Sequence, residues 1–118
     1  MNKKEILKGI KDGDLLLEDL DDKFKTDKEF ILAAIKINDY VLEYADKKLQ
    51  ADREIVLAAV KSSGDALQYA NDSLKKDKEI VLEAVKENGY ALEYADDSLK
   101  NDRDILAIVN KKKNEETL

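Results

Sequence analysis

The chain has 118 residues, of which 43% are hydrophobic and 41% are charged, a composition typical of one compact domain or a short repeat array. Its net charge of −6 argues against general nucleic-acid binding, which needs a surplus of cations to face the phosphates. Histidine, cysteine and proline are absent, which excludes disulfides, zinc–thiolate sites and thiol chemistry and removes the residue that most disrupts helices.

The N-terminal segment, MNKKEILKGIKDGD, carries lysines and only scattered apolar residues. It has no continuous apolar stretch like that of a secretory signal, and no run in the chain is long and apolar enough to cross a bilayer. We therefore expect a soluble cytoplasmic protein that does not bind membranes.

A 25-residue pattern repeats along the chain without insertion or deletion. Residues 52–76 and 77–101 are identical at 17 of 25 positions, residues 27–51 carry the same pattern, and residues 2–26 carry a more divergent form. A last copy starts at residue 102 and soon becomes strongly charged. We interpret these as one domain, residues 1–118, with copies 2–26, 27–51, 52–76 and 77–101 and a C-terminal capping half-copy, 102–118.

The first helix of each copy is predicted to begin at a capping aspartate, at Asp27, Asp52, Asp77 and Asp102. An aspartate there accepts hydrogen bonds from the free amides of the first turn. About ten residues later, Gly64 and Gly89 stand where a left-handed residue would end a helix. The apolar residues in between cover about 200° of the helical wheel, which predicts contacts on both flanks, with Leu57 and Leu82 packed inward.

A shorter second stretch follows, YVLEYA at residues 40–45 and DALQYA at residues 65–70. Val41, Leu42 and Ala45 form its narrow apolar side. Leu49 extends this side either as the last turn of the same helix or from a separate turn. Connections this short force neighbouring helices to pack antiparallel or steeply crossed.

A fixed period of this length is the signature of stacked supersecondary units, so the sequence predicts an all-α solenoid of about four and a half two-helix repeats. The end copies support this interpretation. Glu5 and Lys8 in the first copy, and Asn110 in the last, replace apolar residues of the inner copies. Terminal repeats of a solenoid turn such polar sides toward water.

The unit D-x-E-I-V-L-x-A-V-K-x-N-G-x-A-L-x-Y-A, as it stands in residues 77–95, resembles a domain-of-unknown-function family of bacterial tandem helical repeats. The resemblance covers nearly the whole chain and is weakest over residues 1–26, where the Tyr-Ala pair is missing. It implies a helical repeat fold and carries no catalytic residues to transfer.

The side chains that remain for chemistry form no catalytic or metal-binding pattern. The serines, Ser62, Ser63, Ser73 and Ser98, lie in predicted turns with no base beside them. The acidic turn that starts at Asp96 fails the calcium-loop pattern, because Asn101 and Ala107 occupy the positions that need glycine and glutamate. We therefore expect no enzyme activity, no cofactor and no metal.

Basic residues recur in two positions of the repeat, one occupied by Lys36, Lys61 and Lys86 and the other by Lys28, Arg53 and Lys78. Stacking would align them into a stripe, which suits either an anionic partner or an ordinary solvated surface. The glutamates Glu29, Glu54 and Glu79 lie within about 20° of the first position on the helical wheel. This favours a mixed, locally compensated ridge.

All five tyrosines fall in two neighbouring positions of the second stretch. On the helical wheel, Tyr40 and Tyr90 lie about 155° from the apolar side and are expected to be exposed, whereas the position of Tyr44 lies about 115° away, at the boundary. Tyrosine is enriched at interfaces. The candidate binding surface therefore consists of Tyr40, Glu43, Tyr44, Gln68, Tyr69, Tyr90, Glu93 and Tyr94. Packing between successive repeats is the other interpretation of these tyrosines.

We predict a non-catalytic module that binds a protein or peptide through this surface, as a monomer rather than an oligomer. One alternative is a structural spacer or a self-assembling repeat array with no dedicated ligand. Another, suggested by net charge alone, is an acidic inhibitor of a basic protein. Nucleic acids and membranes are not expected partners.

Overall fold

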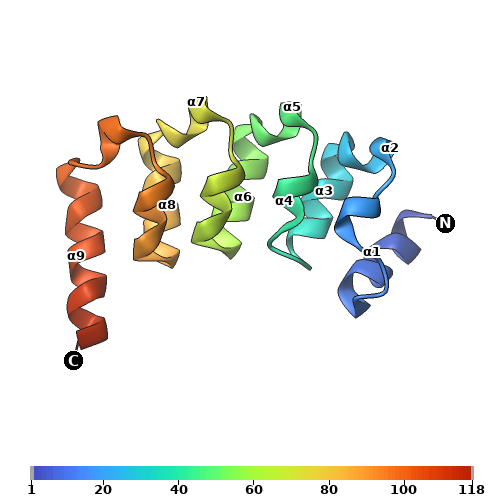
Figure 1. The fold of residues 1–118 in the computed structure, drawn as a ribbon, viewed down its shortest axis with the longest axis horizontal. Helices are drawn as coiled ribbons and strands as arrows, with labels where there is room; N and C mark the ends of the chain where they lie inside the picture. The colour runs from blue at the N-terminus through green and yellow to red at the C-terminus, as the bar shows by residue number, and fades with distance from the viewer. Residues whose placement is uncertain (1, 118) are drawn as a thin grey trace.

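The computed structural model describes residues 2–117 and shows the first helices of the copies standing side by side in a row (Figure 1). They are α1 (Lys3–Asp12), α3 (Lys28–Ile35), α6 (Arg53–Ser62), α8 (Lys78–Glu87) and α9 (Arg103–Thr117). They begin 25 residues apart, as the repeat predicts, and the described residues contain no strand. The molecule measures 48 × 32 × 18 Å, so the fold is an elongated all-α repeat array.

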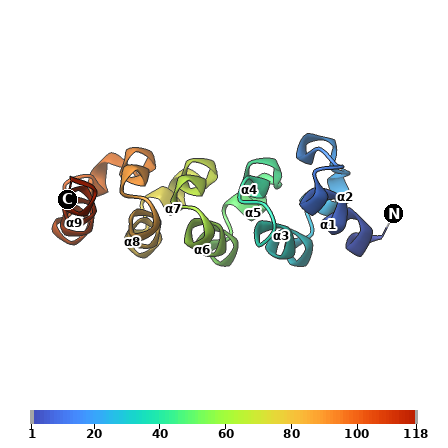
Figure 2. The ribbon, with the colours of Figure 1, turned by 90° about the horizontal axis from the view of Figure 1, so that it is seen from below.

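A second layer of shorter helices covers one side of the first helices (Figure 2). It consists of the 3₁₀ helices η1 (Leu17–Asp19), η2 (Gly64–Tyr69) and η3 (Gly89–Tyr94) and of the single turn α4 (Val41–Tyr44). A third segment of about one turn then leads to the next copy: α2 (Asp22–Lys25), α5 (Lys47–Gln50), α7 (Asp72–Lys75) and η4 (Asp97–Leu99). Leu49 thus belongs to a separate turn, and each full copy has three helical segments rather than the expected two.

Side-chain caps explain where these helices begin. The Oδ1 atoms of Asp27, Asp52, Asp77 and Asp102 each accept a hydrogen bond from the backbone N–H three residues later, at 3.0–3.2 Å. A second set of caps starts the one-turn segments, at Asp21, Asp46, Asn71 and Asp96. Such caps satisfy amides that the first turn of a helix leaves without a partner. The first set confirms the predicted capping aspartates.

The core lies between the two layers and consists of aliphatic side chains. On α6 it buries Ile55, Val56, Ala59 and Val60, with the equivalent residues of α8. Leu57 and Leu82 are only partly buried at its edge, so the prediction that they pack inward was too strong. On the helical wheel this leucine position lies about 130° from the middle of the buried arc, on a side that the second layer does not cover.

Gly64 and Gly89 do not adopt the predicted left-handed conformation. Among the described residues only Gly13, at the end of α1, has a positive φ, of 79°. Gly64 instead starts η2 directly against the backbone of α8, where an added Cβ would lie 2.3 Å from the carbonyl oxygen of Ala84. The glycine at position 64 is therefore required by the close approach of two repeats and not by a turn.

The end copies present polar side chains at positions that are buried or half-buried in the inner copies. Glu5 and Lys8 are exposed on α1, and Asn110 is exposed on α9, as predicted for terminal repeats. The last helix also continues past the point at which α6 and α8 end. Residues 111–113 are lysines, which favour helix, and Asn114 replaces the glycine that begins the second layer in the two preceding copies.

The first copy departs from the repeat in its second layer. Leu15 lies over Gly9, where an added Cβ would be 2.7 Å from its Cδ1 atom. Leu16 is 58% exposed, although the equivalent Val41 of the next copy is fully buried. The divergence of residues 2–26 in sequence is thus matched by a shifted local packing.

Successive copies are joined by two ladders of polar contacts along the edge where the first helices begin. In the ion-pair ladder, the basic residue that opens each first helix reaches acidic residues that open the next one. The pairs are Lys3 with Asp27 at 2.6 Å, Lys28 with Asp52 and Glu54 at 3.0 Å, Arg53 with Asp77 at 2.9 Å and Glu79 at 2.7 Å, and Lys78 with Asp102 at 3.2 Å and Asp104 at 2.7 Å. These basic residues are thus compensated by acidic residues of the neighbouring copy.

In the backbone ladder, the residue that caps each one-turn segment donates its backbone N–H to a carbonyl group of the preceding copy. That carbonyl belongs to the last residue of the preceding one-turn segment. Asp46 donates to Lys25 and Asn71 to Gln50, both at 2.9 Å, and Asp96 donates to Lys75 at 3.0 Å. Because both ladders recur at the same repeat positions, each copy meets its neighbour through equivalent groups.

Acid is expected to destabilise the array through the ion-pair ladder. The hydrogen bond from Arg53 holds the pKa of Asp77 below its ordinary value of about 3.9, against the opposing effect of burial and with help from the amide of Ile80. The pKa values of Asp27, Asp52 and Asp102 are lowered as well. Because these folded-state pKa values lie below the unfolded ones, the stabilisation is complete above about pH 5 and is lost as the pH falls through the folded values.

Asp77→Asn tests this expectation, because asparagine still caps a helix, as Asn2 does in the first copy, but has no charge to pair with Arg53. We expect the variant to be less stable than the wild type at neutral pH and to lose less stability between about pH 5 and pH 2. Urea unfolding at a series of pH values measures both quantities. A pH dependence identical to that of the wild type would show that Asp77 does not contribute to it.

Candidate binding surface

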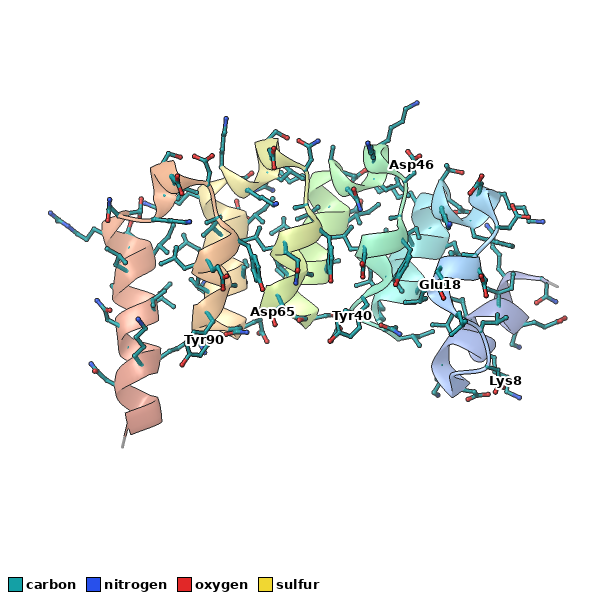
Figure 3. The ribbon with its side chains drawn as sticks, in the orientation of Figure 1. Lys8, Glu18, Tyr40, Asp46, Asp65 and Tyr90 are labelled. Atoms are coloured by element: carbon teal, nitrogen blue, oxygen red, sulfur yellow. The ribbon has the colours of Figure 1, made fainter. Side chains whose placement is uncertain are left out.

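The outer side of the second layer carries the candidate residues, and its first position is exposed in the two copies that have a tyrosine there, whereas Asp65 is half-buried. Tyr40, Asp65 and Tyr90 occupy it, along the edge of the molecule farthest from the one-turn segments (Figure 3). Tyr40 is 61% exposed and Tyr90 is 63% exposed, which confirms the exposure predicted from the helical wheel. Asn38 and Asn88 help to place them, because each Oδ1 atom accepts the backbone N–H of the tyrosine, at 2.9 and 3.0 Å.

The second tyrosine position is partly buried, as predicted for the boundary of the apolar side. Tyr44, Tyr69 and Tyr94 are all half-buried, and the latter two pack against the core. The hydroxyl of Tyr69 lies close to the carboxylate of Glu43 in the preceding copy. Burial, and then the charge of Glu43, raise the pKa of Tyr69. The rings of Tyr69 and Tyr94 therefore contribute to packing, and a role of this position in binding stays a prediction.

Four of the candidate residues come together in one hollow, which we call the tyrosine hollow. Tyr40, Glu43, Tyr44 and Tyr69 line it together with Ile10, Gly13, Leu15, Leu16, Leu17, Glu18 and Asn38, around a volume of about 500 Å³. The hollow spans the first three copies. Its lining is aromatic and aliphatic with two carboxylates, and it includes no basic residue.

The other four candidates lie elsewhere. Tyr90 and Glu93 line a second hollow, which also contains Lys100 and Lys113. Tyr94 lines a third hollow, next to the ion pair between Lys75 and Asp72. The amide of Gln68 donates to the backbone carbonyl of Asp65, in its own copy, at 3.1 Å. The predicted surface is therefore divided into separate regions by the structure.

Leu16, Glu18 and Asn38 belong to the tyrosine hollow but were not predicted. Leu16 and Glu18 come from the divergent first copy, which has no tyrosine, so the tyrosine positions gave no reason to include it. The run of three leucines at residues 15–17 was the available signal, because three consecutive residues of a short helix cannot all face one core. Figure 3 shows Glu18 and Tyr40 on neighbouring second-layer segments.

Charge is unevenly distributed between the layers. The second-layer segments, residues 14–20, 39–45, 64–70 and 89–95, contain seven aspartates and glutamates and no lysine or arginine. All 21 basic residues lie in the first helices, in the one-turn segments and in their connections. The second layer is therefore an acidic surface on a chain whose remaining charges nearly balance.

Within the part of the chain that the structure describes, no three aspartate or glutamate side chains gather closely enough to hold a metal ion. The lowered carboxyl pKa values belong to the ion-pair ladder and to the capping Asp96, outside the tyrosine hollow. Among the described helices, none combines the length and apolar character needed to cross a membrane.

Comparison with known proteins places the repeats in a family. A family model described as a domain of unknown function, DUF4116, matches the chain in tandem at residues 2–50, 52–100 and 77–113. The first two matches are offset by two repeat lengths, so the model corresponds to a pair of 25-residue copies. No curated protein and no solved structure matches the chain.

Proposed function

Because this chain belongs to the DUF4116 family, a domain of unknown function, we propose its role from its surface: it is a non-catalytic module that binds a protein or peptide on the second layer. The observation that supports this proposal is the tyrosine hollow, in which rings from two copies and leucines from a third line one concave region. Exposed tyrosines next to aliphatic side chains are typical of binding sites, because they offer large rigid contact areas at low entropic cost.

The arrangement of the layers suits this role. The first helices and the two ladders hold successive copies in a constant relation, so the second-layer side chains are presented by a rigid support. Preorganised groups bind a partner with a smaller loss of conformational freedom. A partner that lies along the second layer contacts several copies at once, and the hollow already combines three of them.

The alternative role, a structural spacer, is favoured by the elongated shape of 48 × 32 × 18 Å. End-to-end self-assembly has less support. If chains stacked in the geometry of the repeat, Arg103 of one chain would face Asn2 and Lys4 of the next, where the ladder has two acidic residues. Neither residue provides a carboxylate, and Lys4 adds a like charge. We therefore propose a monomeric module.

Replacing both Tyr40 and Tyr90 with serine tests the proposed function. Peptides are selected on the wild-type chain from a random displayed library, and their affinities are then measured by fluorescence anisotropy. We expect the double variant to bind them more than about tenfold more weakly. Its melting temperature is expected to stay nearly unchanged, because both side chains are largely exposed.

Lys36→Ser, an exposed change on the first-helix side, is the matched control and is expected to change neither quantity. Failure to select any peptide, or unchanged binding by the double variant, would favour the spacer. A fall in melting temperature that accounts for the loss of binding would instead assign the two tyrosines to packing.

A further inference from the structure

If the proposed binding function holds, the residues that line the tyrosine hollow indicate which class of ligand it binds. Two carboxylates, Glu18 and Glu43, lie in its lining, and no basic residue does. Three tyrosine rings, those of Tyr40, Tyr44 and Tyr69, stand around the same space. A cation is attracted both by carboxylates and by the faces of aromatic rings, so this combination favours positive charge twice over.

We propose that the occupant is a segment of a partner protein rich in lysine and arginine, with one cationic side chain placed in the tyrosine hollow. The rest of the segment lies along the second layer, whose seven acidic and no basic residues complement its charge. Arginine suits the hollow better than lysine, because its planar guanidinium stacks on aromatic rings and pairs with a carboxylate through two parallel hydrogen bonds.

The same surface disfavours other classes of occupant. An acidic peptide or a nucleic acid would bring phosphates or carboxylates against a layer that holds no cation. A neutral apolar peptide would bury the aromatic rings but would also leave Glu43 and Glu18 less hydrated without a partner for their charges. A cationic segment alone satisfies both the rings and the carboxylates.

The chain contains an internal control for this inference. Tyr90 occupies the repeat position of Tyr40 and is exposed to nearly the same extent, but it shares its hollow with Lys100 and Lys113. Glu93 likewise corresponds to Glu43 and lies in that second hollow. The two tyrosine–glutamate pairs are thus matched in position and differ in the charges around them.

The test uses a dye-labelled peptide of alternating arginine and serine, with glutamine–serine and glutamate–serine peptides as controls, at near-physiological salt. We expect saturable binding of the arginine peptide only. Tyr40→Ser and Glu43→Gln are each expected to weaken it by about tenfold, whereas Tyr90→Ser and Glu93→Gln, which change the second layer outside the tyrosine hollow, are expected to weaken it by no more than about threefold. Tyr40→Phe is expected to retain most of the binding, because it keeps the ring.

Several results would overturn the inference. If the arginine peptide does not bind, the occupant is not cationic, and if the matched variants weaken binding equally, the attraction is general electrostatics and not the hollow. Concentration-dependent self-association in sedimentation, abolished by Glu43→Gln, would make a second copy the occupant. Library peptides that are uncharged and still lose affinity in Tyr40→Ser would preserve the proposed function while rejecting the cationic partner.

Discussion

Replacing Leu67 with alanine is expected to lower the free energy of unfolding by about 2–5 kcal/mol. Leu67 is 0% exposed and lies on η2, a segment that contacts α6 and α8 as well as the neighbouring second-layer segments α4 and η3. Removing the isopropyl group of its side chain leaves a cavity at a point where two repeats meet. The ladders on both sides keep the copies at their spacing, so the cavity is not expected to close by collapse.

Lys61→Ala is the matched control, because Lys61 is exposed on α6 and its change is expected to stay within about 0.5 kcal/mol. Urea unfolding monitored by circular dichroism measures both variants. Equal losses for the leucine and the lysine would mean that the buried and exposed sides of the repeat have been assigned wrongly.

The second large effect is expected from Gly64→Ala, which should destabilise the protein by about 1–3 kcal/mol. An added Cβ would meet the carbonyl oxygen of Ala84 at 2.3 Å and the Cβ of Asn88 at 3.1 Å. A backbone oxygen in a helix cannot move aside as a flexible side chain does, so α6 and α8 would have to separate. The second copy supports this reasoning. Asp39 stands there at the position of Gly64, and α3 ends two residues earlier in its copy than α6 and α8 do in theirs.

Gly89→Ala provides the comparison within the same chain. The nearest atoms to an added Cβ there belong to the side chain of Lys112, at 3.8 Å, which is ordinary contact. We expect this variant to be as stable as the wild type, or up to about 1 kcal/mol more stable, because alanine restricts the unfolded chain. Thermal and denaturant melts of the two variants decide the matter. Equal destabilisation would point to a requirement for glycine at the start of the 3₁₀ helices and not to close approach.

The periodic features of the fold could be predicted from the sequence. The 25-residue spacing, the all-α class and the capping role of Asp27, Asp52, Asp77 and Asp102 all follow from residues that recur in every copy. These features depend on local chemistry, since a capping aspartate acts within its own first turn. The polar character of the two ends could be predicted for the same reason, by comparing one copy with another.

Features that depend on how copies meet were predicted less well. The glycine at residue 64 was assigned to a left-handed turn because that is its commonest role at a helix end, whereas contact with α8 decides its conformation. The helical wheel for the second stretch assumes a period of 3.6, but the stretch forms a 3₁₀ helix or a single turn, and of the two alternatives for Leu49 the separate turn is the one observed. Short segments are ambiguous in this respect, because packing and not propensity determines their geometry.

The candidate site shows the same division. The exposure of Tyr40 and Tyr90 could be predicted from the helical wheel, since it concerns the orientation of a side chain about its own axis. The sequence could not show that the two tyrosines line hollows of different charge. That difference depends on Glu18 from the first copy and on Lys113 from the last helix. Which residues surround a tyrosine is set by the neighbouring copies, and the neighbours of the two differ.

The two ladders also determine how an array of this kind changes in length. In every inner copy, a basic side chain and a backbone carbonyl group bind the copy that follows. An acidic side chain and a backbone N–H bind the copy that precedes. A whole 25-residue copy inserted between two others would therefore find every joining group satisfied on both sides. Duplication or loss of whole copies would need no compensating change elsewhere, whereas insertion of a fraction of a copy within the joining segments would break both ladders at that point.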